Sequence, residues 1–356
     1  MSFEPLKNSL NKTFFQAFFD SWKKLEASFD KQKMEYSIFD ASWNGLELKE
    51  RTRKLSTSIE KQMPADYKKA CTLLINILIQ LENQGEKVGS YEYLFIPDFI
   101  EVYGQKHVEI SLNAIEEVTK FITCEFAIRP LIVQNKSKVL KKMLLWSTHP
   151  HQNVRRLASE GCRPKLPWGM ALKELIKEPK EILPILENLK NDDSLFVRKS
   201  VANNLNDISK DHPNLVINLM KKWQGYSANT DWIIKHACRS LLKAGNQDTM
   251  KLFGYADNKS LVIGKIELLT SKVKMGSALS FKFQLQNKSE KENIIRLEYG
   301  IYFLKSNGKQ NRKVFKLSEK SYKAKERTTI TKSHIIKPIT TRKYYLGEQK
   351  LSLIVN

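Results

Sequence analysis

The chain has 356 residues, more than one hydrophobic core usually serves, so we expect two domains. It carries 60 Lys and Arg against 38 Asp and Glu, and the net charge of +22 favours a polyanion such as nucleic acid, although an anionic membrane surface would attract it too. The cysteines form no short pairs of the kind found in zinc or redox sites, and no stretch approaches 18 uncharged apolar residues. We therefore expect a cytoplasmic protein with reduced thiols, no metal, no cofactor and no membrane partner.

Residues 1–258 are predicted to be helical. Apolar residues recur at helical spacing in several segments, for example 73–81, 139–144 and 182–189. Proline and clusters of Asp, Asn and Ser interrupt these segments, which indicates many short antiparallel helices.

A weak repeat lies within this helical part. Three helices begin with a basic pair after a polar turn, at positions 154, 197 and 234, which are 43 and 37 residues apart. This period is typical of HEAT-like two-helix repeats, in which successive helices show one concave surface. If the helices stack, their basic residues form a strip that could follow DNA phosphates; the alternative is ordinary solvated helix charge. The strip would contain Arg155, Arg156, Arg198, Lys199, Lys235, His236 and Arg239.

The stretch VRRLASEGCRPKLPWGM, residues 154–170, joins an amphipathic helix to a basic loop. The helix is predicted to end at Gly161. Pro164 and Pro167 would stiffen the loop that presents Trp168, and the alternative is a tryptophan buried under that loop.

Two acidic residues interrupt the basic strip. In the predicted helix 197–210, Val197, Val201, Leu205 and Ile208 form the buried row, so that Asn203, Asn206 and Asp207 should face elsewhere. In the preceding repeat, Arg156 and Glu160 hold the places of Lys199 and Asn203. Either these acids take part in catalysis, or Glu160 pairs with Arg156 and Asp207 pairs with Lys199 or Lys210 in ordinary ion pairs that contribute little to stability.

Residues 259–356 are predicted to form a small immunoglobulin-like β-sandwich. SFKFQLQN, residues 280–287, alternates apolar and polar side chains, and Asn307-Gly308 between two strand-like runs predicts a hairpin. We count six or seven short strands, the number expected for such a sandwich. This part holds 22 Lys and Arg against 7 Asp and Glu, which suits contact with a phosphate backbone.

Many short strings resemble the AlkC-type bacterial DNA alkylation repair glycosylases in order and spacing. They span residues 4–255 and include IPDFIEVYG, CEFAIRPLI, WSTHPHQNVRRLASEGCRPKLPW and VRKSVANNLNDISKDHP. Residues from 259 resemble, by strand pattern, the immunoglobulin-like domain of one subset of that family. The fold implied is a HEAT-like α-helical solenoid followed by a small immunoglobulin-like β-sandwich.

The resemblance implies an enzyme that excises cationic N-methylated bases, chiefly 3-methyladenine and 3-methylcytosine, from double-stranded DNA without metal or cofactor. Carried over residue by residue, its catalytic positions are Glu125, Glu160, Trp168 and Asp207. It also implies action on the bacterial nucleoid, and we expect a monomer.

These residue types suit the implied reaction. Methylation makes the base cationic and a good leaving group, so fixed carboxylates need only stabilise the oxocarbenium character of the sugar. Trp168 offers a π face worth about 0.5 to 2 kcal/mol to a cation. Arg155, Arg156, Arg163 and Lys165 would hold the DNA backbone. The alternative is a non-catalytic HEAT-repeat scaffold that binds DNA or an acidic protein.

Overall fold

The computed structural model of the chain describes residues 5–255, 258–339 and 342–356. The chain divides into two compact units, Met1–Ala237 and Cys238–Asn356. The first unit is helical, and the second contains two short α-helices and the 3-10 helix Asn258–Ser260, followed by all strands of the described residues. The domain boundary after residue 258 stays a prediction.

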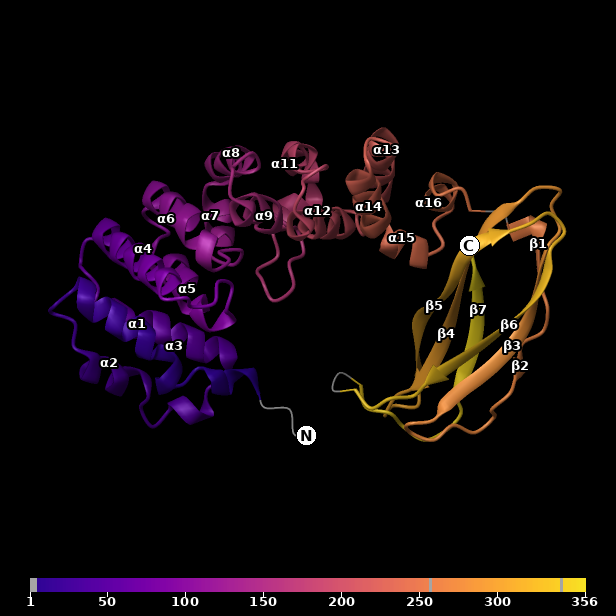
Figure 1. The fold of residues 1–356 in the computed structure, drawn as a ribbon, viewed down its shortest axis with the longest axis horizontal. Helices are drawn as coiled ribbons and strands as arrows, with labels where there is room; N and C mark the ends of the chain where they lie inside the picture. The colour runs from indigo at the N-terminus through magenta and orange to yellow at the C-terminus, as the bar shows by residue number, and fades with distance from the viewer. Residues whose placement is uncertain (1–4, 256–257, 340–341) are drawn as a thin grey trace. The chain divides into compact units, whose positions relative to one another are not determined.

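Short helices fill the first unit (Figure 1). They are α1 Lys12–Leu25, α2 Lys31–Ile38, α3 Leu48–Glu60, α4 Tyr67–Asn83, α5 Phe95–Tyr103, α6 Val108–Phe121, α7 Ile128–Gln134, α8 Lys136–Trp146, α9 Gln152–Glu160, α10 Lys173–Lys177, α11 Leu183–Asn188, α12 Leu195–Ile208, α13 Pro213–Trp223 and α14 Ala228–Ala237. Helices α15 Arg239–Lys243 and α16 Gln247–Leu252 belong to the second unit.

Local sequence explains where several helices begin. The side chains of Asn11, Asp30 and Asp66 each accept a hydrogen bond from the backbone N–H three residues later, which satisfies a donor that the first helical turn leaves open. The predicted organisation of many short helices is confirmed.

Helices α6, α9, α12 and α14 pack in sequence to form one row of the solenoid. In Figure 1, helices α8, α11 and α13 lie along one side of this row. Polar side chains join its members: the Ser159 and Ser200 hydroxyls lie 2.6 Å apart, Asn204 Nδ2 donates to the Ser159 carbonyl, and Asn206 Nδ2 donates to the Ala237 carbonyl. The helical repeat region expected from the sequence is therefore present.

Arg155 and Arg198 make the same contacts in successive repeats. Nη1 of Arg155 donates to the carbonyls of His149 and Pro150, and Nη1 of Arg198 donates to those of Asp192 and Asp193. Each arginine thus binds the carbonyls five and six residues before it. The shared role of these side chains is to hold the turn that precedes their helix.

The second unit contains two antiparallel sheets. In one, β3 Ala278–Asn287 pairs with β1 Leu261–Ile263, β2 Glu267–Leu268 and β6 Arg327–Ile335; in the other, β4 Asn293–Leu304 lies between β5 Gln310–Tyr322 and β7 Lys350–Val355. This small two-sheet β domain confirms the predicted fold of the C-terminal part.

The core between the sheets follows the predicted alternation. Phe281, Phe283 and Leu285 of β3 are buried, and they pack with buried side chains of β4 such as Leu297 and Tyr299. The Asn307-Gly308 pair lies in the turn between β4 and β5, where Gly308 has φ +75°, a backbone conformation that favours glycine.

Candidate active site

Three carboxylates come together at one end of successive inner helices. Glu125 lies between α6 and α7, Glu160 is the last residue of α9, and Asp207 lies near the end of α12. Glu160 and Asp207 are only 5% and 3% exposed. Asn206 and Asp207 were predicted to face away from the apolar row of α12, and both are nevertheless buried because the neighbouring repeats cover this side of the helix as well.

Basic side chains alternate with these acids in a chain of ion pairs, which we call the charge network; it is buried around Glu160, Arg163 and Asp207 and reaches the surface at Lys210. It consists of Glu125, Arg156, Glu160, Arg163, Asp207 and Lys210.

Geometry within the charge network is well defined. Arg156 donates to the Glu125 carboxylate, and its Nη2 lies 3.3 Å from Glu160 Oε1. Arg163 donates from Nη1 to Glu160 Oε1 at 2.7 Å and from Nε to Asp207 Oδ2 at 2.8 Å. Lys210 Nζ reaches the other Asp207 oxygen at 3.0 Å. Each carboxylate is therefore fixed in orientation by at least one cation.

Arg163 holds the centre of the charge network. Burial by itself lowers the pKa of this guanidinium, but Glu160 and Asp207 outweigh that effect and hold the pKa above its ordinary value. Arg163 was predicted to bind phosphate, yet the residue is only 6% exposed and its ion-pair partners are two carboxylates. In this structure the side chain therefore orients two carboxylates, and its contact with phosphate stays a prediction.

Part of the alternative interpretation also holds. Glu160 pairs with Arg156 and Asp207 pairs with Lys210, as a purely structural reading of these acids predicts. Lys199 takes no part in the charge network. Two contacts were not suggested by spacing: Arg156 with Glu125, 31 positions apart, and Arg163 with Asp207, 44 positions apart.

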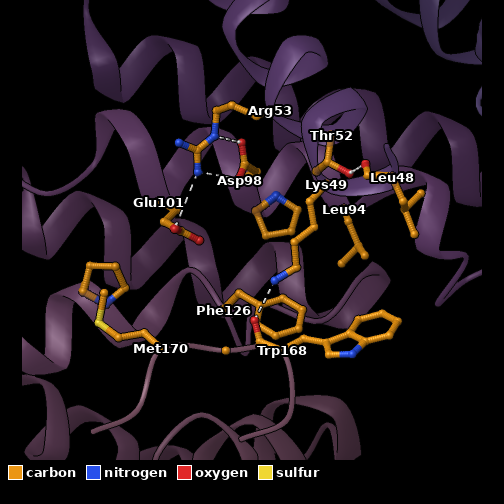
Figure 2. A pocket seen from close by; sticks show the side chains of 13 residues that line it. Leu48, Lys49, Thr52, Arg53, Leu94, Asp98, Glu101, Phe126, Trp168 and Met170 are labelled. Atoms are coloured by element: carbon orange, nitrogen blue, oxygen red, sulfur yellow. Dashed lines mark hydrogen bonds and ion pairs between the residues drawn. The ribbon is translucent and has the colours of Figure 1, made fainter. Parts of the chain in front are cut away.

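Trp168 lies on the loop that begins directly after Glu160. The residue is 74% exposed, so the tryptophan is not buried under the loop. Its φ of +64° is unusual for a residue other than glycine and costs about 1 to 3 kcal/mol, which surrounding contacts must offset. One such contact is drawn in Figure 2: Lys49 Nζ of α3 donates to the Trp168 carbonyl at 2.7 Å.

Arg129 of α7 donates hydrogen bonds to both ends of this loop. The side chain is 1% exposed; Nη1 donates to the Gly161 carbonyl at 3.0 Å and Nε donates to the Met170 carbonyl at 2.6 Å. Burial lowers the pKa of Arg129 to about 10. Arg129 was not among the residues predicted from the sequence, although it stands within the CEFAIRPLI string.

The structure places the remaining predicted basic residues outside the charge network. Arg155 pairs through Nε with Asp192 at 2.6 Å, and Lys165 pairs with Asp211. Lys199 and Lys235 are exposed, and His236 stacks on Trp232 with ring centroids 4.9 Å apart. Arg239 begins α15, in the second unit.

Phe196 is a further aromatic residue that the sequence analysis did not single out. It lies at the start of α12 and is exposed, and its ring centroid is 4.9 Å from the Arg156 guanidinium carbon. The contact orients Arg156 between an aromatic face and the carboxylates of the charge network. A large apolar residue next to the buried-row residue Val197 is the signal that could have identified it.

The described residues hold no group of three or more His, Cys, Asp and Glu side chains that could bind a metal ion. Within the same residues, no helix is long and apolar enough to cross a membrane. The four cysteines are buried free thiols, as expected, and burial raises the pKa of Cys162 to about 12.

Sequence comparison identifies two families along the chain. The family described as DNA alkylation repair enzyme matches residues 48–241, and the C-terminal Ig-like domain of an uncharacterised protein, YhaZ, matches residues 262–356. The uncharacterized protein YhaZ of Bacillus subtilis (strain 168) is 39% identical over 328 residues, which cover 92% of this chain and 89% of the relative. The chain belongs to the DNA alkylation repair enzyme family.

A solved structure of this alkylation repair family resembles the whole chain. The alkylpurine DNA glycosylase AlkC of Pseudomonas fluorescens, bound to DNA containing an abasic site analog, has a TM-score of 0.91 and 33% identity, and the match covers 99% of this chain and 96% of that chain. The resemblance to AlkC-type proteins noted in the sequence is therefore confirmed. Every residue of the charge network lies within the part matched by the DNA alkylation repair enzyme family.

Proposed function

We propose that this member of the family is a DNA glycosylase that hydrolyses the N-glycosidic bond of cationic N-alkylated bases, chiefly 3-methyladenine and 3-methylcytosine, in double-stranded DNA. The observation that carries the proposal is the charge network, which fixes three carboxylates in orientation, one of them, Glu160, directly before the loop of an exposed tryptophan. The DNA-bound relative supports DNA as the substrate.

In this reaction the bond between C1′ of the deoxyribose and the base nitrogen breaks, and its electron pair leaves with the base. The base is thereby neutralised, so no acid is needed to protonate it. Positive charge develops on the sugar instead, where Glu125, Glu160 and Asp207 stabilise it electrostatically. Water then bonds to C1′ and passes its proton to a carboxylate or to solvent.

Trp168 and the basic side chains would bind and orient the DNA. The exposed indole of Trp168 offers a π face to the cationic base or sugar. Exposed cations of the predicted strip, such as Lys199 and Lys235, would contact phosphates, and the 22 basic residues from position 259 onward would add a second DNA-binding surface.

Release of methylated base from alkylated duplex DNA in the presence of EDTA tests the proposal. We expect full activity, because the chemistry uses only carboxylates and water. Loss of activity in EDTA with recovery on adding a divalent metal would show that the proposed chemistry is wrong. The ion pairing of the acids also fits a non-catalytic DNA-binding scaffold, and that reading predicts DNA binding with no base release.

A further inference from the structure

Glu125 differs from the other two carboxylates of the charge network because it lies outside a helix, in the segment 122–127 that joins α6 to α7. Its side chain is 14% exposed, against 7% for that of Glu160 and 4% for that of Asp207, so a substrate reaches it most easily. Since its backbone is not part of a helix, Glu125 depends on other contacts to hold its carboxylate in one orientation.

Thr123, in the same segment, supplies such contacts. Its Oγ1 donates to Glu125 Oε2 at 3.0 Å, and it accepts from Arg156 Nη1 at 2.8 Å and from the backbone N–H of Glu125 at 3.3 Å. A threonine hydroxyl has one hydrogen to donate and two lone pairs that accept, so its capacity is completely used. The hydroxyl is therefore fixed, and it holds both the backbone and the carboxylate of Glu125.

Arg156 is the second donor to Glu125, but it is shared among several groups. Its Nη1 donates to Glu125 Oε2 as well as to Thr123 Oγ1, which closes a triangle of hydrogen bonds. Its Nη2 lies 3.3 Å from Glu160 Oε1, and the guanidinium faces the ring of Phe196. Thr123 lies only two residues before Glu125, so its contact with the carboxylate is local and does not depend on the other partners of Arg156.

The contacts of the Glu125 carboxylate all involve one oxygen. Thr123 Oγ1 and Arg156 Nη1 both donate to Oε2. Among the residues that the structure describes, none donates a hydrogen bond to Oε1. One oxygen is thus anchored, and the other keeps its capacity to accept a hydrogen bond from water or to face a cation.

We propose that Thr123 is a positioning residue for base excision: it anchors Oε2 of Glu125, so that Oε1 meets the developing sugar cation and the attacking water. The inference rests on the proposed function and deepens it, because it gives the two oxygens of one carboxylate different tasks. A carboxylate held in one orientation stabilises charge without reorganising during the reaction. Since a displacement of about 1 Å can cost roughly 100-fold in rate, loss of this anchor has a measurable effect.

Single-turnover excision of 3-methyladenine from duplex DNA by the full chain tests the role. Thr123→Val removes the hydroxyl and keeps the shape, so the rate should fall about tenfold while Kd for the alkylated duplex changes by no more than about twofold. Thr123→Ser keeps the hydroxyl and should stay within about threefold of the parental rate. Thr123→Ala removes the hydroxyl without placing a methyl group beside Arg156, and it gives the same comparison if Thr123→Val does not fold.

A double-mutant cycle separates positioning from general support of the fold. In a Glu125→Gln background, Thr123→Val should change the rate by no more than about twofold, because the contribution of the carboxylate is already lost. An equal loss of rate in both backgrounds would show that Thr123 acts on something other than Glu125, and it would overturn the proposal.

Thr230→Val is the matched control. Thr230 of α14 is another threonine whose hydroxyl makes more than one contact: it donates to the Lys190 carbonyl at 2.8 Å and lies 3.0 Å from Ser227 Oγ. Neither contact reaches the charge network. The variant should lower the thermal midpoint, and the folded protein should excise base at the parental rate.

The same assay distinguishes this proposal from the proposed function. Excision at the parental rate by Thr123→Val would overturn the role of Thr123 and leave the glycosylase function standing. Absence of base release by the unaltered protein would overturn the proposed function, and the role of Thr123 in the reaction would fall with it.

Discussion

A carboxylate stabilises a developing positive charge most effectively when it does not have to reorient during the reaction. In the charge network, Arg163 binds Glu160 and Asp207 through different nitrogen atoms, so both oxygens are fixed before substrate arrives. The same pairing would also serve a purely structural purpose. The catalytic and the structural role of these carboxylates can be distinguished by substitutions that remove the negative charge and keep the shape of the side chain.

Asp207→Asn and Glu125→Gln make that separation at the residue scale. Each variant should lower the single-turnover rate of 3-methyladenine excision by about 100-fold or more, because a neutral isostere removes the stabilisation of the sugar cation. Affinity for alkylated DNA should change little, since the surface keeps its shape. Single-turnover kinetics and equilibrium DNA binding measure the two effects. Parental excision rates in both variants would identify these acids as structural and favour the scaffold.

Removal of Arg163 should affect stability. Arg163→Met leaves Lys210 as the cation paired with Asp207 and removes the closest cation from Glu160. Both carboxylates are buried. Breaking a buried ion pair from one side costs about 3 to 5 kcal/mol, and the free energy of unfolding should fall by that amount. Urea denaturation measures it. A decrease below 1 kcal/mol would show that the charge network does not stabilise the fold.

Sequence spacing predicted some of this site and not the rest. It placed Glu160 at the end of a helix, because apolar periodicity and the glycine after it mark that end. It gave no contact between Arg163 and Asp207, since that contact depends on how two repeats stack. Arg129 was missed for a similar reason: an arginine in an apolar string acquires partners only when the loop from Gly161 folds over it.

At the scale of elements, the loop from Gly161 to Met170 is the feature that presents Trp168. Arg129 lies beneath it, and a Cβ added at Gly169 would come within 3.4 Å of Arg129 Cδ and 3.0 Å of Leu166 Cδ2. Close packing of this kind leaves little room for the loop to shift. The exposed tryptophan is thus held by buried contacts of its own loop.

Arg129→Met should release the loop. Both carbonyl contacts are lost, so the excision rate should fall at least tenfold while DNA affinity changes less than threefold, because Trp168 loses its fixed position. Arg129→Lys retains a donor and should recover part of the rate. Single-turnover kinetics with each variant provides the measurement.

Arg51→Met is the control for general destabilisation. Arg51 is also a buried arginine that donates to two backbone carbonyls, those of Lys7 and Leu46. Its replacement should lower the thermal midpoint to a similar degree and leave excision by the folded protein unchanged. Equal losses of excision rate in both variants would contradict a specific role for Arg129.

Periodicity was most successful at the element scale. It predicted the helical repeats and the alternating strands, because both patterns follow directly from which side chains are buried. It also placed Arg155 and Arg198 at equivalent positions, and the structure shows them in one shared role. That role is to bind the turn before the helix. Charge alone did not distinguish it from a role in binding phosphate.

At the scale of the whole molecule, the excess of positive charge is concentrated in the C-terminal part. Residues 259–356 hold 22 of the 60 Lys and Arg but only 7 of the 38 Asp and Glu. Within the described residues of this part, ion pairs such as Arg296 with Glu298 and Lys316 with Glu319 use some of the acids internally. Most of the positive charge therefore has no acidic counterpart within the same domain.

Deleting residues 259–356 should weaken DNA binding and flatten its dependence on salt, because each phosphate neutralised contributes about 0.9 to the slope of log affinity against log salt. Tyr255, which is buried and bridges to Ile294 of β4, would lose its cover, so a second truncation after Ala237 should be compared. Circular dichroism checks that each fragment is folded. Titration of a lesion-bearing duplex at several salt concentrations then gives the slope. An unchanged slope in a folded fragment would mean that the basic β domain does not contact DNA and that its charge serves another partner.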